Sequence, residues 1–209
     1  MTPVTFNNDK ENMISLCIIA LNEEKYLKGA LQNTKGYFNE TVIIDGGSTD
    51  STLSIAHEFT ENVFTNKFNN DFSEQRNFAI SKCTNPWVFM LDADERLEQN
   101  LLDIIGDLVE FNKLIDLFIF PRINTIVDLD NHPELITMYG WNIDNKKRIN
   151  YPDLQGRLFK NKKDIYWVNK VHEKLTGYKS YSVVEGYHII HEKDYLRQTK
   201  QNLFYSTLV

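Results

Sequence analysis

The chain has 209 residues, of which 42% are hydrophobic and 25% are charged, the usual balance for one globular domain with a substantial core. Its formal net charge of −6 argues against a nucleic-acid-binding protein that works by neutralising phosphates. It does not exclude a phosphate ligand, because a bound cation reverses the local sign of the charge. The two cysteines, Cys17 and Cys83, form no CxxC or Cys/His cluster, so we expect buried thiols in a reducing compartment and no zinc site.

The segment from residue 1 to residue 11 is polar and lacks the basic and then apolar profile of a signal peptide. No stretch approaches the roughly 18 apolar residues that are needed to span a bilayer. We therefore expect a cytoplasmic protein, with docking on the inner face of a membrane left open. The sequence gives no oligomeric state.

The first half of the chain alternates short apolar runs with helical patterns. Strands are predicted at 14–20, 41–44, 63–65 and 87–91, and helices at 23–35, 49–59, 71–82 and 98–110. Within the third helix, Asp71 and Glu74 have the spacing of a capping box. This alternating order predicts an α/β fold with a mostly parallel, Rossmann-like central sheet and helices on both faces. Ligands of such sheets bind beyond the carboxyl ends of the strands, so the polar residues that follow each strand are candidate site residues.

The second half has a different pattern. Strands are predicted at 116–122, 158–160, 165–168 and 181–184, and an amphipathic helix at 194–208. The segment 123–151 is rich in predicted loops. This half predicts a smaller, mixed region beside the parallel sheet.

Two acids, Asp92 and Asp94, follow the apolar run 87–91 directly, with Ala93 between them. In extended backbone, residues two apart project to the same side, and two carboxylates there repel each other unless a cation sits beside them. Mg²⁺ and Mn²⁺ are typically held by few carboxylates together with phosphates and water. The pattern predicts a divalent metal beside a phosphate ligand. The structural alternative is an acidic turn that caps the helix predicted at 98–110.

The run Asp45-Gly46-Gly47-Ser48 follows the second predicted strand. Its glycines permit positive φ angles and close approach of a ligand to the backbone, and Asp45 is able to accept hydrogen bonds from a base or ribose. A glycine turn with Ser48 or Thr49 capping the next helix is compatible with this role and is expected in any case. The pattern is neither GxGxxG nor GxxxxGK[ST], so dinucleotide and P-loop sites are excluded.

Four further positions carry candidate chemistry. Arg76 is placed to reach a phosphate or to hold the acid pair, although a surface arginine paired with a glutamate of its own helix is an equal alternative. Glu173, next to His172, is a candidate general base, although an acid–imidazole pair on a strand is more often simply exposed. His188 and His191 are expected to face opposite ways on a strand, and one of them is a candidate metal ligand against the commoner structural role.

Taken together, these segments resemble family 2 glycosyltransferases of the GT-A fold. The segments that carry the resemblance are 15–24, 42–52, Gln75-Arg76-Asn77 and 91–96, in that order. The later segments Gly156-Arg157-Leu158-Phe159 and Val171-His172-Glu173 resemble the branch of bacterial lipopolysaccharide-core β-glucosyltransferases. The resemblance covers about residues 14 to 191, and it departs from the family in having two glycines after Asp45 and no alignable match over 123–151.

The resemblance implies an inverting transfer of a sugar from a nucleotide sugar, commonly a UDP-sugar, to a hydroxyl of a glycan, lipid-linked or protein acceptor. It implies Mg²⁺ or Mn²⁺ at Asp92 and Asp94, with His191 as a further candidate ligand, and Glu173 as the base. The implied nucleotide-sugar contacts are Ala20, Leu21, Asn22, Glu23, Asp45, Gly46, Gly47, Ser48, Arg76, Asp92, Ala93, Asp94 and Arg157. Residues 1–209 then form a single domain, with a nucleotide-sugar half at about 12–110 and an acceptor and catalytic half at about 111–209.

Two other functions compete with this interpretation. A sugar nucleotidyltransferase shares the fold style and the need for metal, but it normally has a glycine-rich basic loop where this chain has Asn22-Glu23-Glu24. A non-catalytic module that binds nucleotide sugars predicts the same acids around the ligand and no effect of changing Glu173. No partner that is a nucleic acid is expected.

Overall fold

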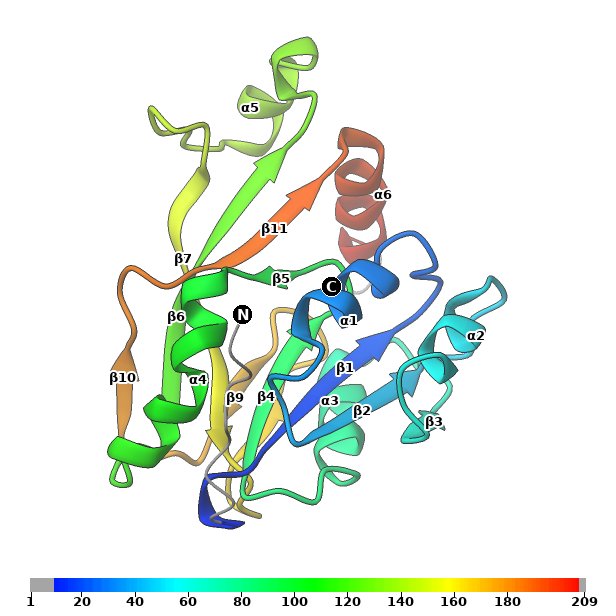
Figure 1. Cartoon of the computed structure of the whole chain (residues 1–209). Helices are drawn as coiled ribbons and strands as arrows, with labels where there is room; N and C mark the ends of the chain where they lie inside the picture. Colours follow the sequence, from blue (N-terminus) through cyan, green and yellow to red (C-terminus); the bar gives the residue numbers. More distant parts are fainter. Residues whose placement is uncertain (1–9, 207–209) are drawn as a thin grey trace.

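The structure of the protein is a computed structural model that describes residues 10–206. Within these residues, nine strands form one sheet, in the order β3–β2–β1–β4–β7–β6–β11–β5 with β10 added on β6, and β8 and β9 form a separate pair. Figure 1 places helices in front of and behind the sheet, with β6 and β7 rising toward α5. The sequence prediction that residues 1–11 carry no signal peptide falls largely outside the described residues. The last two residues of the helix predicted at 194–208 also lie outside them.

The first half of the chain forms the parallel part of the sheet. Its strands are β1 (Ile14–Ala20), β2 (Glu40–Asp45), β3 (Val63–Thr65) and β4 (Trp87–Asp92). β1 lies between β2 and β4 and runs parallel to both, and β3 continues the sheet beyond β2. Leu16 and Ile18 pack on one face while Cys17 and Val42 pack on the other, because a strand covered by helices on both sides is apolar throughout. The predicted parallel α/β core is confirmed.

Helices cover both faces of this core. Their bounds are α1 (Leu27–Thr34), α2 (Thr52–His57), α3 (Phe72–Ile80) and α4 (Gln99–Phe111), with a short 3₁₀ turn, η1, at Lys10–Asn12. α1, α2 and α4 pack on the face of Leu16, whereas α3 packs on the face of Cys17. The side chain of Asp71 accepts a hydrogen bond from the Glu74 amide at 2.9 Å, which confirms Asp71 as the cap of α3.

The second half extends the same sheet. Its elements are β5 (Arg96–Leu97), β6 (Leu117–Ile126), η2 (Leu129–Asn131), α5 (Glu134–Tyr139), β7 (Ile149–Lys160), β8 (Tyr166–Val168), β9 (Lys174–Thr176), β10 (Tyr181–Val183), β11 (Ile189–Lys193) and α6 (Tyr195–Ser206). β7 runs antiparallel to both β4 and β6, and β11 runs parallel to β6. β1, β4, β6 and β11 therefore all end at the same edge of the sheet, which is where a ligand site of this fold is expected.

Two predicted helices begin later than the sequence pattern indicates. The helix predicted at 23–35 starts at Leu27, because Asn22 takes a positive φ of 55° and residues 23–26 form a turn. The helix predicted at 49–59 starts at Thr52, after Ser51, which makes no side-chain capping bond. The expected cap at Ser48 or Thr49 is therefore wrong.

The largest errors fall in the second half. The segment 123–151, predicted as loops, contains the end of β6, α5 and the start of β7, and the short strand predicted at 158–160 is the last part of the twelve-residue β7. β5, β9 and β11 are absent from the prediction. Gly156 weakens the strand pattern of the sequence, yet it lies within β7. An added Cβ at this position would come within 3.2 Å of the Leu117 side chain, so the absence of a side chain allows the two strands to pack closely.

No helix among residues 10–206 is both long enough and apolar enough to cross a membrane.

Candidate functional site

A pocket of about 1130 Å³ opens at the edge where β1, β4 and β11 end, and residues of α6 form its far wall. Most of the site residues predicted from the sequence line this pocket. They are Ala20, Leu21, Asn22, Glu23, Gly46, Arg76, Asp92, Ala93, Asp94, Glu173 and His191. Asp45, Gly47, Ser48 and Arg157 lie next to the pocket without lining it. The fold thus brings together segments from both halves of the chain.

The two acids after β4 do not lie on one extended strand. β4 ends at Asp92, and the Glu95 amide donates to the Asp92 carbonyl at 3.0 Å, so residues 92–95 form a turn. Because of this turn, Asp92 and Asp94 contact different partners rather than projecting side by side. The expected extended geometry is wrong, and so is the alternative that these acids cap α4, because the residue before that helix is Glu98.

Asp92 is held by two buried arginines. Its Oδ1 accepts from Arg76 Nη2 and its Oδ2 from Arg157 Nη2, both at 2.8 Å. Burial alone would raise the pKa of Asp92, but the charges of Arg157 and Arg76 outweigh it and hold the pKa well below its usual range. Both carboxylate oxygens therefore already have cationic donors, and a metal ion on Asp92 would have to compete with them.

Arg76 links Asp92 to the candidate base. Its Nε donates to Glu173 Oε1 at 2.7 Å, and its guanidinium lies over the Trp167 ring at 5.1 Å. The arginine is only 6% exposed, so it is not a surface residue paired within its own helix. Its Nη1 is buried and makes no hydrogen bond with the described residues, so the arginine keeps one unsatisfied donor beside the pocket.

Glu173 lies in the loop between β8 and β9 and not on a strand, and the neighbouring His172 has a positive φ of 53°. This loop turns both side chains into the pocket, where the Glu173 side chain is 14% exposed. His172 lies edge-on to the Tyr205 ring of α6, with ring centroids 6.2 Å apart. The candidate base therefore has one oxygen fixed by Arg76 and a position within the cavity.

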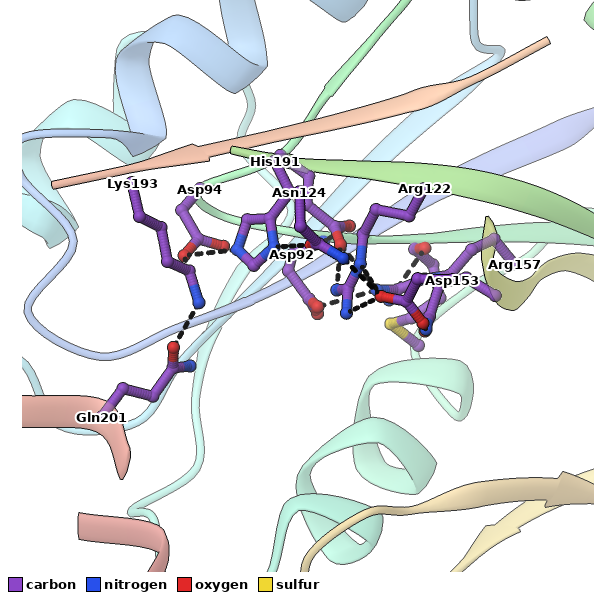
Figure 2. Close-up of polar contacts among 12 residues, drawn as sticks. Asp92, Asp94, Arg122, Asn124, Asp153, Arg157, His191, Lys193 and Gln201 are labelled. Atoms are coloured by element: carbon purple, nitrogen blue, oxygen red, sulfur yellow. Dashed lines mark hydrogen bonds and ion pairs between the residues drawn. The ribbon is translucent and has the colours of Figure 1, made fainter. Parts of the chain in front are cut away.

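Asp94 and His191 converge at the end of β11. Asp94 Oδ2 lies 3.2 Å from His191 Nε2, and Figure 2 shows the imidazole between Asp94 and Asn124. Asn124 Nδ2 donates to Asp153 Oδ2 at 2.8 Å, which leaves Asn124 Oδ1 to accept from His191 Nδ1 at 2.8 Å. With Nδ1 donating to Asn124, the Nε2 contact with Asp94 is a hydrogen bond when both ring nitrogens carry protons, whereas in the neutral imidazole Nε2 carries the lone pair and faces the Asp94 carboxylate.

A lone pair and a carboxylate that face each other are a donor set for a cation. Mg²⁺ and Mn²⁺ use one or two protein ligands with phosphates and water, so Asp94 and His191 fit such an ion when a diphosphate completes the shell. Among the described residues, no group of three or more His, Cys, Asp or Glu side chains forms a metal cage by itself. His188, the other candidate, contacts Glu98 and Tyr151 instead.

The Asp45 loop is shaped by its own hydrogen bonds. Asp45 is 3% exposed and accepts from the amides of Gly47 and Ser48 at 2.9 to 3.2 Å. Gly47 has a φ of 96°, which favours glycine, and a Cβ on Gly46 would come within 3.3 Å of Leu21. The loop also binds Asn22, whose amide donates to Ser48 Oγ at 2.9 Å. The glycine pair therefore serves to pack this loop against the end of β1.

Several residues of the site were missed by the sequence prediction. They are Glu95, Arg122, Asn124, Asp153, Lys193 and Arg197. Glu95 is fully buried, and its Oε1 accepts from Arg122 and Arg157 at 2.8 Å each. Its position directly after Asp94 was an available signal. Arg122 and Arg197 lie in the strand predicted at 116–122 and the helix predicted at 194–208, whereas Asn124, Asp153 and Lys193 lie in parts of strands that were not predicted, and nothing in the local sequence of these five residues placed them near the acids.

Arg197 of α6 contacts the acids of two strand ends. Its Nε and Nη2 donate to Asp94 Oδ2 at 3.0 and 2.8 Å, and Nη2 also donates to Glu23 Oε1 at 2.8 Å. Burial would raise the pKa of Asp94, but the His191 hydrogen bond and the charges of Lys193 and Arg197 lower it far below the ordinary value. Burial raises the pKa of Glu23 by more than the hydrogen bond and charge of Arg197 lower it, so the pKa of Glu23 lies above its ordinary value. Asp94 is therefore a firmly ionised carboxylate.

The match to a family model decides the relationship of the chain. The model described as glycosyl transferase family 2 matches residues 15–182. This chain belongs to glycosyl transferase family 2. The lipopolysaccharide core biosynthesis glycosyltransferase LpsC of Rhizobium meliloti (strain 1021) is 34% identical over 100 residues, which cover 46% of this chain and 37% of LpsC. The uncharacterized glycosyltransferase RT0209 of Rickettsia typhi (strain Wilmington) is 38% identical over 92 residues, covering 44% of this chain and 31% of that protein.

Among solved structures, S. aureus TarS residues 1–349 in complex with UDP-GlcNAc superposes with a TM-score of 0.58 at 16% identity. The alignment covers 85% of this family 2 chain and 58% of the TarS chain. The predicted GT-A fold and the resemblance to the lipopolysaccharide-core branch are both confirmed. The match spans well under half of the length of LpsC and of RT0209.

Proposed function

We propose that this family 2 chain transfers a sugar, with inversion, from a UDP-sugar to a hydroxyl of a glycan, lipid-linked or protein acceptor in bacterial surface-glycan synthesis, at the cytoplasmic face of the membrane. The observation that carries the proposal is the pocket in which Arg76 joins the candidate base Glu173 to Asp92, with Asp94 and His191 on the adjoining wall. The substrate class is supported by the similarity to LpsC, a glycosyltransferase of lipopolysaccharide core biosynthesis, and to TarS, whose structure is known in complex with UDP-GlcNAc.

In the proposed reaction, Glu173 takes the proton of the acceptor hydroxyl as that oxygen attacks the anomeric carbon. The bond from the anomeric carbon to the phosphate oxygen breaks on the opposite face, and the nucleoside diphosphate leaves with the electron pair. Arg76 holds Glu173 Oε1, so the carboxylate keeps one orientation. A positioned base of this kind contributes roughly 10²- to 10⁴-fold to the rate.

A divalent cation, Mg²⁺ or Mn²⁺, belongs to the proposal. Asp94 and His191 would hold it, and it would supply charge neutralisation on the departing diphosphate. Asp92, which the sequence also nominated as a metal ligand, would act through its two arginines in keeping the turn of residues 92–95 in place. Electrostatic stabilisation of the leaving group is expected to be the larger effect on rate.

The decisive assay follows release of UDP and formation of glycosylated product from a panel of UDP-sugars, with Mn²⁺ and after chelation. Glu173→Gln keeps an oxygen for Arg76 Nε, so the fold is preserved while the base is lost. We expect this variant to lose about 10²- to 10⁴-fold in turnover and to keep its affinity for UDP. Glu192→Gln is the matched control, because Glu192 is half exposed and its ion pair with Arg96 is 3.8 Å long.

Four results would contradict parts of the proposal. Full turnover by Glu173→Gln would remove the base, and turnover that chelation leaves unchanged would remove the metal. UDP binding without turnover of any donor, and without an effect of Glu173→Gln, would identify a non-catalytic nucleotide-sugar module. Formation of a UDP-sugar and pyrophosphate from UTP and a sugar 1-phosphate, without release of UDP from any UDP-sugar, would identify a sugar nucleotidyltransferase.

A further inference from the structure

Arg197 and the cation site compete for one carboxylate oxygen. Asp94 Oδ2 takes both Arg197 contacts, at 3.0 and 2.8 Å, and it is also the oxygen that faces His191 Nε2 at 3.2 Å. An oxygen held by a two-point guanidinium contact cannot at the same time coordinate a metal through the same lone pairs. A cation held between Asp94 Oδ2 and His191 Nε2 would therefore displace Arg197 from that oxygen.

The surroundings of Arg197 define where its charge can go. Its side chain is 21% exposed and lines the pocket, its guanidinium lies over the Tyr26 ring at 4.4 Å, and Glu23 Oε1 gives it a second acid at 2.8 Å. The backbone beneath it is fixed, because Asp194 accepts from the Arg197 amide at 2.8 Å and from Lys25 and Tyr26 of the first half. The guanidinium is thus able to move within the pocket while α6 stays in place.

We propose that Arg197 is the counter-ion that Asp94 exchanges for a divalent cation, and that the released guanidinium becomes a ligand of the donor's diphosphate. The inference rests on the proposed function, since it assumes that a nucleoside diphosphate and its cation bind in this pocket. Arg197 suits the second role because a guanidinium offers two parallel donors to phosphate oxygens. Lys193 adds a second positive charge near this carboxylate: its amine lies 4.0 Å from Asp94 Oδ2, and its side chain is 6% exposed.

Exchange makes a prediction that a purely structural ion pair does not make. Removing Arg197 takes away a competitor for Mn²⁺ at Asp94 and also takes away a ligand of the diphosphate. Arg197→Gln is therefore expected to bind Mn²⁺ alone about tenfold more tightly and to bind UDP in saturating Mn²⁺ about tenfold more weakly. The two affinities move in opposite directions.

Two measurements on the full chain test this. Electron paramagnetic resonance of free Mn²⁺ gives the affinity for the metal alone, and isothermal titration calorimetry gives the affinity for UDP in saturating Mn²⁺. Arg148→Gln is the matched control: Arg148 also pairs with an acid, Asp144 at 2.6 Å, lies over the Tyr151 ring at 3.4 Å and is 18% exposed, but it does not line the pocket. Both of its affinities are expected to equal those of the wild type.

Arg197→Lys keeps the charge and loses the two-point contact, so it serves if the glutamine variant does not fold. It is expected to weaken UDP binding by about threefold or more, while the affinity for Mn²⁺ alone changes less than in the glutamine variant. Unchanged UDP affinity in both variants, or a parallel loss of both affinities, overturns the exchange. If the wild type binds no UDP with or without Mn²⁺, the proposed function itself fails. If the wild type binds UDP and Arg197→Gln binds it equally well, only the proposed role of Arg197 fails.

Discussion

Glu95 offers the sharpest test of how the site is built, because it has no proposed contact with substrate. Its side chain is fully buried, Oε1 accepts from Arg122 and Arg157 at 2.8 Å each, and Oε2 accepts from the Asp92 amide at 3.0 Å. Glu95→Gln keeps the size of the side chain and removes its charge. The two arginines then share Asp92 and Asp153 as their remaining acids.

Removing one partner of a buried ion pair costs about 3–5 kcal/mol, since it leaves a buried charge without compensation. Glutamine has a single carbonyl oxygen, which accepts either from the arginines or from the Asp92 amide while its NH₂ group faces the other donor, so we expect Glu95→Gln to cost at least about 3 kcal/mol. Natural domains have about 5–15 kcal/mol of stability, so this one change removes a large part of the total. A change of that size is easily resolved in an unfolding experiment.

The assay is equilibrium unfolding in urea, followed by circular dichroism and analysed by linear extrapolation. Glu192→Gln is the control, with an expected change within about 0.5 kcal/mol, because Glu192 is half exposed and its ion pair is long. A cost below about 1 kcal/mol for Glu95→Gln, at an unchanged slope, would refute the view that the arginines depend on this buried acid. Equal effects of the two variants would refute it as well.

Three further outcomes follow from particular sites. Gly177→Ala is expected to lower the free energy of unfolding by about 3 kcal/mol, because φ is 83° and a Cβ would lie 1.5 Å from the Asp164 carbonyl oxygen. Gly140→Ala, where φ is 63° and no atom lies near the added Cβ, should cost about 1 kcal/mol. Equal costs of the two variants in urea unfolding would contradict this. Although burial opposes it, hydrogen bonds from a backbone amide and two lysines lower the pKa of Asp116 to about 2. Its contribution, about 1–2 kcal/mol, is present above pH of about 4 and is lost as the pH falls toward 2, so Asp116→Asn should flatten the loss of stability in acid, and an acid profile equal to wild type would count against it. Asp94→Asn should lower the affinity for Mn²⁺ in calorimetry by at least about tenfold, and unchanged metal binding would move the cation elsewhere.

The parallel core could be predicted from the sequence because its signals are local. The runs that become β1 and β4 are apolar throughout, as buried strands are, and Asp71 occupies the cap position of α3. The strand ends then pointed to Asp92, Asp94 and the Asp45 loop without any knowledge of distances. The structure adds that these residues lie at or beside one pocket, whereas their roles in binding and catalysis stay predictions.

The remainder could not be predicted because it depends on partners far along the chain. β7 contains Pro152 and Gly156, which weaken the strand pattern, yet it pairs with β4 and β6 on both sides. β11 ends in the polar run His191-Glu192-Lys193, and its polarity makes sense only beside the acids that it meets. Charge pairs across more than 90 residues leave no periodic trace in either segment.

The far wall of the pocket has a consequence for how the chain becomes competent during synthesis. His191 meets a residue 97 positions earlier, and Arg197 meets one 174 positions earlier. Residues 14–92 therefore leave the ribosome before His191 and Arg197 do, so β1 to β4 can pair while the binding site still lacks these two side chains. Closing such long loops is slow compared with forming local contacts, so the appearance of nucleotide affinity should lag behind compaction in a refolding time course.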